Sequence, residues 1–170
     1  MAAGVGYIQN SSGVNEIIKD SSPANESSMW KGSASVLHVK TGLYLNGAFV
    51  DKDNNNGDPN TRLYYVQGGI AKNWTGLGNT VVYGEYAKVT DGLIATAAQD
   101  VLGTGDSVTG SEATVWGFGV VQHIDAAAME VFLSYRRFSA EFESLPGGGF
   151  GTGASFNDMD VVMGGARIKF

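Results

Sequence analysis

Few residues in this chain have the types and spacing that chemistry requires. Its 170 residues include two histidines and no cysteine, so thiolate chemistry and disulfides are excluded. Neither His38 nor His123 stands at metal-ligand or acid–base spacing from carboxylates. The glycine-rich segments 103–105 and 147–149 lack the helix and lysine that follow a phosphate-binding loop. We therefore expect no enzymatic activity and no cofactor.

One acidic loop offers weak metal chemistry. Asp51, Asp53 and Asn55 have the alternate spacing with which calcium loops present oxygen ligands. However, Gly57 comes one residue later than in the EF-hand pattern, and no late Glu follows. The alternative is a solvated turn, which these departures favour.

Charged residues that alternate with apolar ones are the stronger candidates. In the last eleven residues one face is apolar as far as Phe170, while Arg167 and Lys169 lie on the other. Period two indicates a strand whose faces meet different surroundings, and the face with the cations needs water. Residues 129–136 alternate in the same way, with the odd-numbered residues outward. The polar side chains expected to line water are Glu130, Ser134, Arg136, Arg167 and Lys169. They either tune which solutes pass or pair with one another and hold a barrel together.

Several aromatic residues fall near the predicted strand ends, where membrane barrels carry girdles of aromatic side chains. They are Trp30, Trp74, Trp116, Tyr135 and Phe170. Ordinary packing within a sheet is the alternative for each of them.

The elements that position these residues are about eight strands joined by alternately short and long connections. Short turns are predicted near Lys40, Trp74 and Asp125, and mostly longer connections near 22, 55, 100 and 148. In an antiparallel meander, this puts all short turns at one rim, as in bacterial outer-membrane barrels. The composition agrees, because 25 Gly and 3 Pro suit twisted strands, and no apolar run reaches the ~20 residues of a membrane helix. We predict an all-β, up-and-down transmembrane β-barrel.

Two segments carry a resemblance to a known family. Residues 119–130 and 133–138 resemble the late hairpin of alphaproteobacterial porins, and residues 162–170 are similar to their C-terminal strand. The strand pair around Trp74 and 82–86 also fits, so the likeness runs from about Ser33 onward. Family members are longer, typically sixteen-stranded and trimeric. Residues 1–170, one domain, would match the C-terminal half of their barrel.

This resemblance implies a porin-type component of a Gram-negative outer membrane. Its partners would be membrane lipid, further copies of the chain in a homo-oligomer, and small hydrophilic solutes and ions that diffuse passively. The resemblance also implies that Phe170 is read as an assembly signal. A net charge of −6 without clustered Lys or Arg gives no reason to expect nucleic acid.

Two alternatives stay open from the sequence. The first is a small closed outer-membrane barrel without a wide pore, which acts as an anchor or a surface-binding protein. The second is a soluble β-sandwich whose acidic loop at 51–58 binds calcium.

Overall fold

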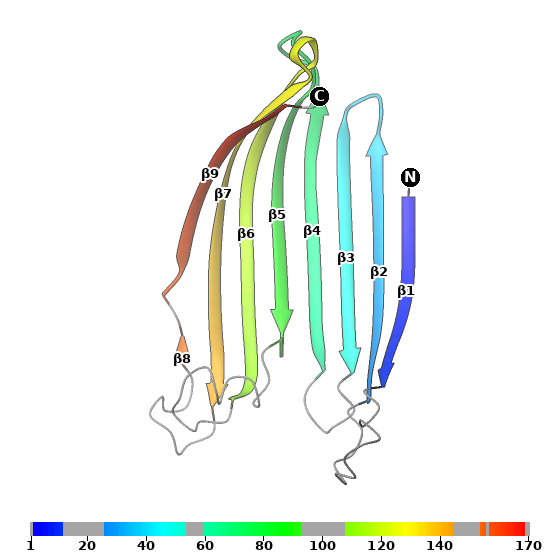
Figure 1. Ribbon diagram of the computed structural model, residues 1–170, viewed down its shortest axis with the longest axis vertical. Helices are drawn as coiled ribbons and strands as arrows, with labels where there is room; N and C mark the ends of the chain where they lie inside the picture. Colours follow the sequence, from blue (N-terminus) through cyan, green and yellow to red (C-terminus); the bar gives the residue numbers. More distant parts are fainter. Residues whose placement is uncertain are drawn as a thin grey trace, which may run out of the picture.

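The computed structural model describes residues 2–11, 26–53, 60–92, 108–144, 154–155 and 157–168. They form one curved antiparallel sheet (Figure 1). Its strands are β1 (Ala2–Ser11), β2 (Glu26–His38), β3 (Leu43–Asp53), β4 (Thr61–Lys72), β5 (Thr80–Thr90), β6 (Val108–Ile124), β7 (Met129–Ser144), β8 (Ala154–Ser155) and β9 (Met159–Ile168). A single 3-10 turn, η1 (Asp125–Ala127), joins β6 to β7.

The strands follow one another across the sheet in chain order from β1 to β7. Both the two-residue β8 and β9 pair with β7, so the sheet has eight strand positions. The predicted all-β, up-and-down arrangement of about eight strands is therefore confirmed. The sheet is not closed, because β1 pairs only with β2 and β9 only with β7 in the described part of the chain. That part also holds no second sheet, which a sandwich would require.

The short connections all lie at one end of the sheet, where β1 also begins and β9 ends (Figure 1). We call this the turn end; its turns span residues 39–42, 73–79 and 125–128. At the opposite end, which we call the loop end, β1, β3, β5 and β7 finish and β2, β4 and β6 begin (Figure 1). Residues 12–25, 54–59, 93–107 and 145–153, where the long connections are predicted, lie outside the described residues. Within the described ranges no helix has the length and apolar character that crossing a membrane demands.

Several strands extend further toward the loop end than the sequence predicts. We predict a second strand from Trp30 and a sixth from Ala113, but β2 begins at Glu26 and β6 at Val108. The predicted loop after Phe138 is likewise strand as far as Ser144. These predictions are wrong because polar side chains suggest a loop in the sequence, whereas the backbone hydrogen bonds of the sheet continue there, as in the pairing of Glu112 with Glu141.

The sheet has no core of its own. Among the described residues no large side chain is fully buried, whereas many large apolar ones are exposed, such as Leu133 at 55% and Val162 at 71%. A chain of this length would normally bury a core on folding. The folded state therefore depends on what meets the two faces of a single layer.

A pair of glycines tests the turn that joins β2 to β3. Gly42 and Gly76 both have φ +77°, but a Cβ on Gly42 would collide with the carbonyl oxygen of Ala71, whereas one on Gly76 meets nothing within 4 Å. We expect Gly76→Ala to lower the free energy of unfolding by about 1 kcal/mol, the usual cost of a left-handed residue. Gly42→Ala should cost about 2–4 kcal/mol, because steric overlap adds to it. Denaturant unfolding of the refolded variants measures both, and equal costs would contradict the described turn.

Candidate functional site

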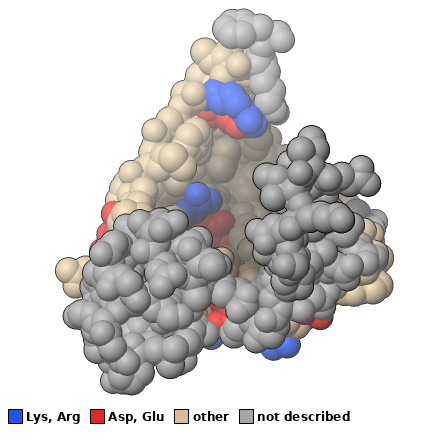
Figure 2. All heavy atoms as spheres, turned by 60° about the horizontal axis from the view of Figure 1, so that its bottom comes forward, with Lys and Arg blue, Asp and Glu red and all other residues tan. Residues whose placement is uncertain are grey.

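The strand register sorts the side chains onto two faces of opposite character. The face that we call polar carries, among others, Asn46, Tyr65, Gln67, Glu85, Glu130, Ser134, Arg136 and Arg167. The opposite face, which we call apolar, carries Val36, Leu45, Val66, Val82, Phe118, Val120, Val131, Leu133 and Val162 among others. Figure 2 shows a hollowed surface in which Lys and Arg atoms lie beside Asp and Glu atoms.

A polar row crosses the middle of the polar face at right angles to the strands. The register aligns Asn46, Gln67, Glu85 and Arg136, with Gly117 between the last two. The Asn46 amide donates to Oε1 of Gln67 at 3.0 Å, and the Tyr65 hydroxyl donates to Oε2 of Glu85 at 3.3 Å. Arg136 donates through Nε to Oε1 of Glu85 at 2.5 Å. In β5 the alternation puts one charged residue on each face, Glu85 on one and Lys88 on the other, so the sequence alone does not show which face is polar. In the structure Glu85 points to the polar face.

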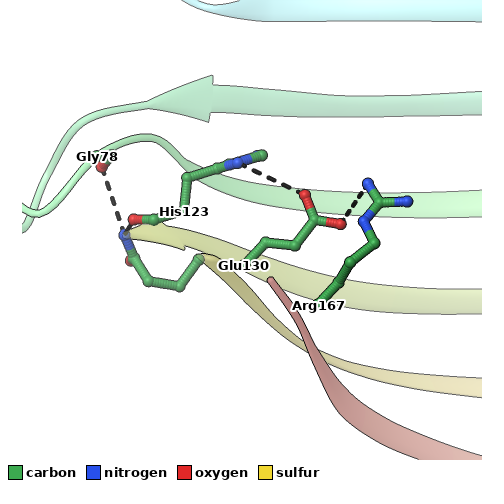
Figure 3. Close-up of polar contacts among 5 residues, drawn as sticks. Gly78, His123, Glu130 and Arg167 are labelled. Carbon is green, nitrogen blue, oxygen red and sulfur yellow. Dashed lines mark hydrogen bonds and ion pairs between the residues drawn. The ribbon is translucent and has the colours of Figure 1, made fainter. Parts of the chain in front are cut away.

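A second charged cluster lies at the turn end of the same face (Figure 3). The Glu130 carboxylate stands between two partners, with Oε1 2.5 Å from Nη2 of Arg167 and Oε2 3.8 Å from Nδ1 of His123. Ser134 is buried, and its hydroxyl donates to the Met163 carbonyl oxygen at 3.4 Å. The structure thus brings four of the five expected water-lining residues onto one face. The fifth, Lys169, lies outside the described residues.

Rings on the polar face lie against glycines of the next strand. A Cβ on Gly69 would come 2.8 Å from the Tyr44 hydroxyl, and one on Gly119 would come 2.7 Å from the Tyr83 ring. The Phe132 ring covers Gly165 in the same way. Since a glycine offers no side chain at that place, the ring atoms come close to the backbone of the neighbouring strand. A larger residue at these three glycines would push the rings away from the sheet.

The metal candidates do not come together in the described structure. Asp51 lies in β3 on the apolar face, where its Oδ2 is 3.4 Å from Nε of Arg62. Asp53 is on the same strand, and Asn55 lies outside the described residues. No group of three or more histidine, cysteine or acidic residues within the described ranges could hold a metal ion.

A line of aromatic residues crosses the apolar face. Each of the strands β1 to β7 contributes one, in the order Tyr7, Trp30, Phe49, Tyr64, Tyr86, Trp116 and Tyr135. On β9, Val162 pairs with Tyr135 and continues the line. Two residues further toward the loop end, the apolar face turns polar on every strand from β2 onward, at Ser28, Asp51, Arg62, Lys88, Thr114, Arg137 and Asp160. We call these the aromatic line and the polar margin.

The aromatic line is inclined to the hydrogen-bonded rows of the sheet. Tyr7 and Trp30 share a row, as do Trp116 and Tyr86, but the register places Tyr135 six residues nearer the turn end than Glu141, which lies in the row of Tyr7. The line therefore shifts by one residue per strand between β1 and β7. With about 3.4 Å per residue and about 4.8 Å between strands, this slope corresponds to an angle of about 35°.

Charges bound the apolar band at both ends. At the loop end, ion pairs join Arg62 to Asp51 and Lys88 to Glu112, and Arg137 lies 3.2 Å from Asp158 and 3.3 Å from Asp160. Toward the turn end, Lys72 follows Ile70 on β4. Arg62 and Lys72 are separated by ten residues of strand, about 34 Å, or about 28 Å after projection through that angle. Between them the exposed surface of the strand is apolar.

The structure separates the expected girdle residues. Trp30, Trp116 and Tyr135 lie on the aromatic line, where Trp30 also packs on Tyr7 at 4.6 Å and Trp116 on Tyr135 at 5.5 Å between ring centroids. Trp74 lies in the turn between β4 and β5 and is exposed, whereas Phe170 lies outside the described residues. Sequence reasoning missed Tyr7, Phe49, Tyr64 and Tyr86. In each case a polar residue lies two positions further toward the loop end on the same strand. This shared pattern can be recognised only once the strand register is known.

Comparison with known proteins adds no assignment, since no family model, curated protein or solved structure matches this chain.

The central ion pair generates a stability prediction. The Glu85 side chain is only 8% exposed, so Arg136→Met leaves its charge without its strongest partner and should lower the free energy of unfolding by about 2–4 kcal/mol. The matched variant Arg62→Met breaks an exposed pair on the other face and should cost no more than about 1 kcal/mol. Adding Glu85→Gln to Arg136→Met should restore part of the loss, because it removes the stranded charge. The measurement is the denaturation midpoint of the wild-type protein, the two single variants and the double variant. A larger loss in Arg62→Met than in Arg136→Met would contradict the stabilising role of the Glu85–Arg136 pair.

Proposed function

We propose that this chain forms part of the wall of a porin-type β-barrel in a bacterial outer membrane. Its function is the passive diffusion of small hydrophilic solutes and ions. The observation that carries the proposal is the apolar face with its inclined aromatic line and polar margin.

The apolar face fits lipid better than water. Soluble proteins rarely expose a continuous apolar surface of this extent, and a polar margin directly behind aromatic residues matches the interface between acyl chains and headgroups. Barrel strands tilt by about 35–45°, and the angle of about 35° from the aromatic line agrees with that range. In a barrel tilted in this way, the aromatic line runs level in the membrane plane. The height between Arg62 and Lys72 is likewise close to the apolar band of about 25 Å in outer-membrane barrels.

The polar face fits a water-filled path. It carries paired charges, amides and hydroxyls, while glycines let the rings of Tyr44, Tyr83 and Phe132 lie close to the neighbouring strand. A closed barrel of about eight strands has an interior that side chains fill, whereas water-filled porins use about sixteen to eighteen strands. We therefore propose a component of a larger barrel, completed by a further sheet, rather than a narrow barrel of this chain alone.

A pair of arginine substitutions on β7 tests the lipid contact. Leu133 and Ser139 lie on the apolar face of the same strand, Leu133 inside the apolar band and Ser139 beyond the polar margin. Leu133→Arg should destabilise the membrane-inserted protein by about 2–4 kcal/mol, and Ser139→Arg by about 0–1 kcal/mol, because the cost follows depth in the bilayer. Unfolding in detergent or lipid gives both values, and the outer-membrane level should fall for Leu133→Arg alone.

The opposite result is expected if the face meets water. Leu133 is 55% exposed, so arginine there would be tolerated about as well as at Ser139, and the protein would refold in plain buffer. Equal stability of the two variants together with detergent-free refolding would refute the proposal.

A further inference from the structure

The two ion pairs of the polar face share an orientation that bears on which ions pass. In each pair the carboxylate is the more buried partner: the Glu85 side chain is 8% exposed against 37% for Arg136, and Glu130 is 13% exposed against 64% for Arg167. A charge held in the wall is partly hidden from the hollow, whereas the guanidinium above it meets the water. Both pairs therefore present their positive end.

The oxygens of each carboxylate face other side chains of the sheet. In Glu85, Oε1 accepts from Arg136 and Oε2 from the Tyr65 hydroxyl. In Glu130, Oε1 faces Arg167 and Oε2 faces His123. A cation passing along the hollow would have to displace these partners to find an oxygen ligand, whereas an anion meets exposed guanidinium groups directly.

The positive positions recur along the height of the wall. On β7, Glu130 and Arg136 are six residues apart, so the two ion pairs are about 20 Å apart along the strand. Nearer the loop end the register places Lys31 and Lys52 on the same face, and Lys31 lies over Gly6, where a Cβ would be 2.9 Å from its Cε. On the polar face of the described strands, four Lys and Arg side chains thus stand against two carboxylates.

This balance is opposite to that of the whole chain, whose net charge is −6. Part of the difference lies on the apolar face near the loop end, where the acidic residues outnumber the basic ones: Asp51, Asp53, Glu112, Glu141 and Asp160 stand against Arg62, Lys88 and Arg137. The separation of charge between the faces means that net charge does not predict the field inside the hollow. That field depends on the residues that line it.

We infer that the polar face favours small anions, such as chloride and short carboxylates, over cations of similar size. The inference rests on the proposed channel function and adds its selectivity. A unit charge about 7 Å from an ion's path in water changes the local ion concentration about threefold, and the effect weakens as salt shortens the screening length. The selectivity should therefore be clear at 0.1 M salt and small at 1 M.

Reversal potentials in a KCl gradient test the inference. The full chain is purified in detergent and then reconstituted in planar bilayers. The mass of its oligomer is measured in the detergent used for purification. The wild-type protein should prefer chloride over potassium. Arg136→Gln with Arg167→Gln should lower the chloride-to-potassium permeability ratio at least about threefold. Arg167→Gln alone, at the more exposed pair, should shift the ratio in the same direction even if Arg136→Gln impairs folding.

Two further variants distinguish the effect of charges on the polar face from the effect of the total charge of the protein. Arg62→Gln with Arg137→Gln removes the same charge from the apolar face and should leave the permeability ratio unchanged. Glu130→Gln removes a carboxylate from the polar face and should raise the ratio.

The failures of the two proposals are distinguishable. Cation preference in the wild-type channel, or equal shifts in the polar-face and apolar-face variants, would overturn the selectivity and leave the channel standing. No conductance from a folded, membrane-inserted oligomer whose mass supplies the about sixteen strands of a water-filled barrel would overturn the channel and the selectivity together.

Discussion

A sheet one layer thick has no interior, and every other feature of this structure follows from that constraint. Its backbone groups are paired across the ladder, but its side chains can bury area only against whatever covers each face. No large side chain among the described residues is fully buried, so burial within the sheet contributes little. The faces solve the problem differently. One is apolar between its charged margins and suits a surrounding medium of the same character, whereas the other pairs its polar groups with one another, as Glu85 does with Tyr65 and Arg136.

Much of the fold can be predicted from the sequence because period-two alternation is a local property. It predicts which side chains of β6, β7 and β9 share a face, and the lengths of the connections predict that consecutive strands are neighbours in the sheet. Properties that depend on residues far apart in the sequence cannot be predicted in this way. The sequence does not show to which face Glu85 points, because Arg136, its ion-pair partner, is 51 residues away. The strand ends were missed because ladder hydrogen bonds do not depend on side-chain polarity. The aromatic line was missed because each of its residues is ordinary alone, and only the register shows the constant shift.

The charged residues of the polar face need not be assigned to stability or to function alone. Each arginine neutralises a carboxylate that is less exposed than the arginine itself, and the cost of leaving such a charge unpaired explains why the pair persists. The same geometry places the guanidinium nearer to the water. Where the two partners are equally exposed, as in the pair of Arg62 and Asp51 at 53% and 39%, little net field remains. Unequal burial would allow one pair both to hold the sheet together and, in the proposed channel, to act on passing ions.

The open edges place a further constraint on whatever completes the proposed barrel. In lipid, the backbone groups on the outer edges of β1 and β9, which pair with no other strand among the described residues, must find partners in further strands. In the proposed barrel the aromatic line must also stay parallel to the membrane plane in the added strands, because the interface between acyl chains and headgroups is flat. A strand that pairs with β1 should therefore carry its interfacial aromatic residue level with Tyr7 or displaced toward the loop end. On the other side, a strand that pairs with β9 should carry it level with Val162 or displaced toward the turn end. With one residue of shift per strand, the displacement averages about one residue at each added strand. A second sheet that lacked this continuation would tilt its own apolar band out of the membrane plane, so the register of this chain restricts which sheets can close with it.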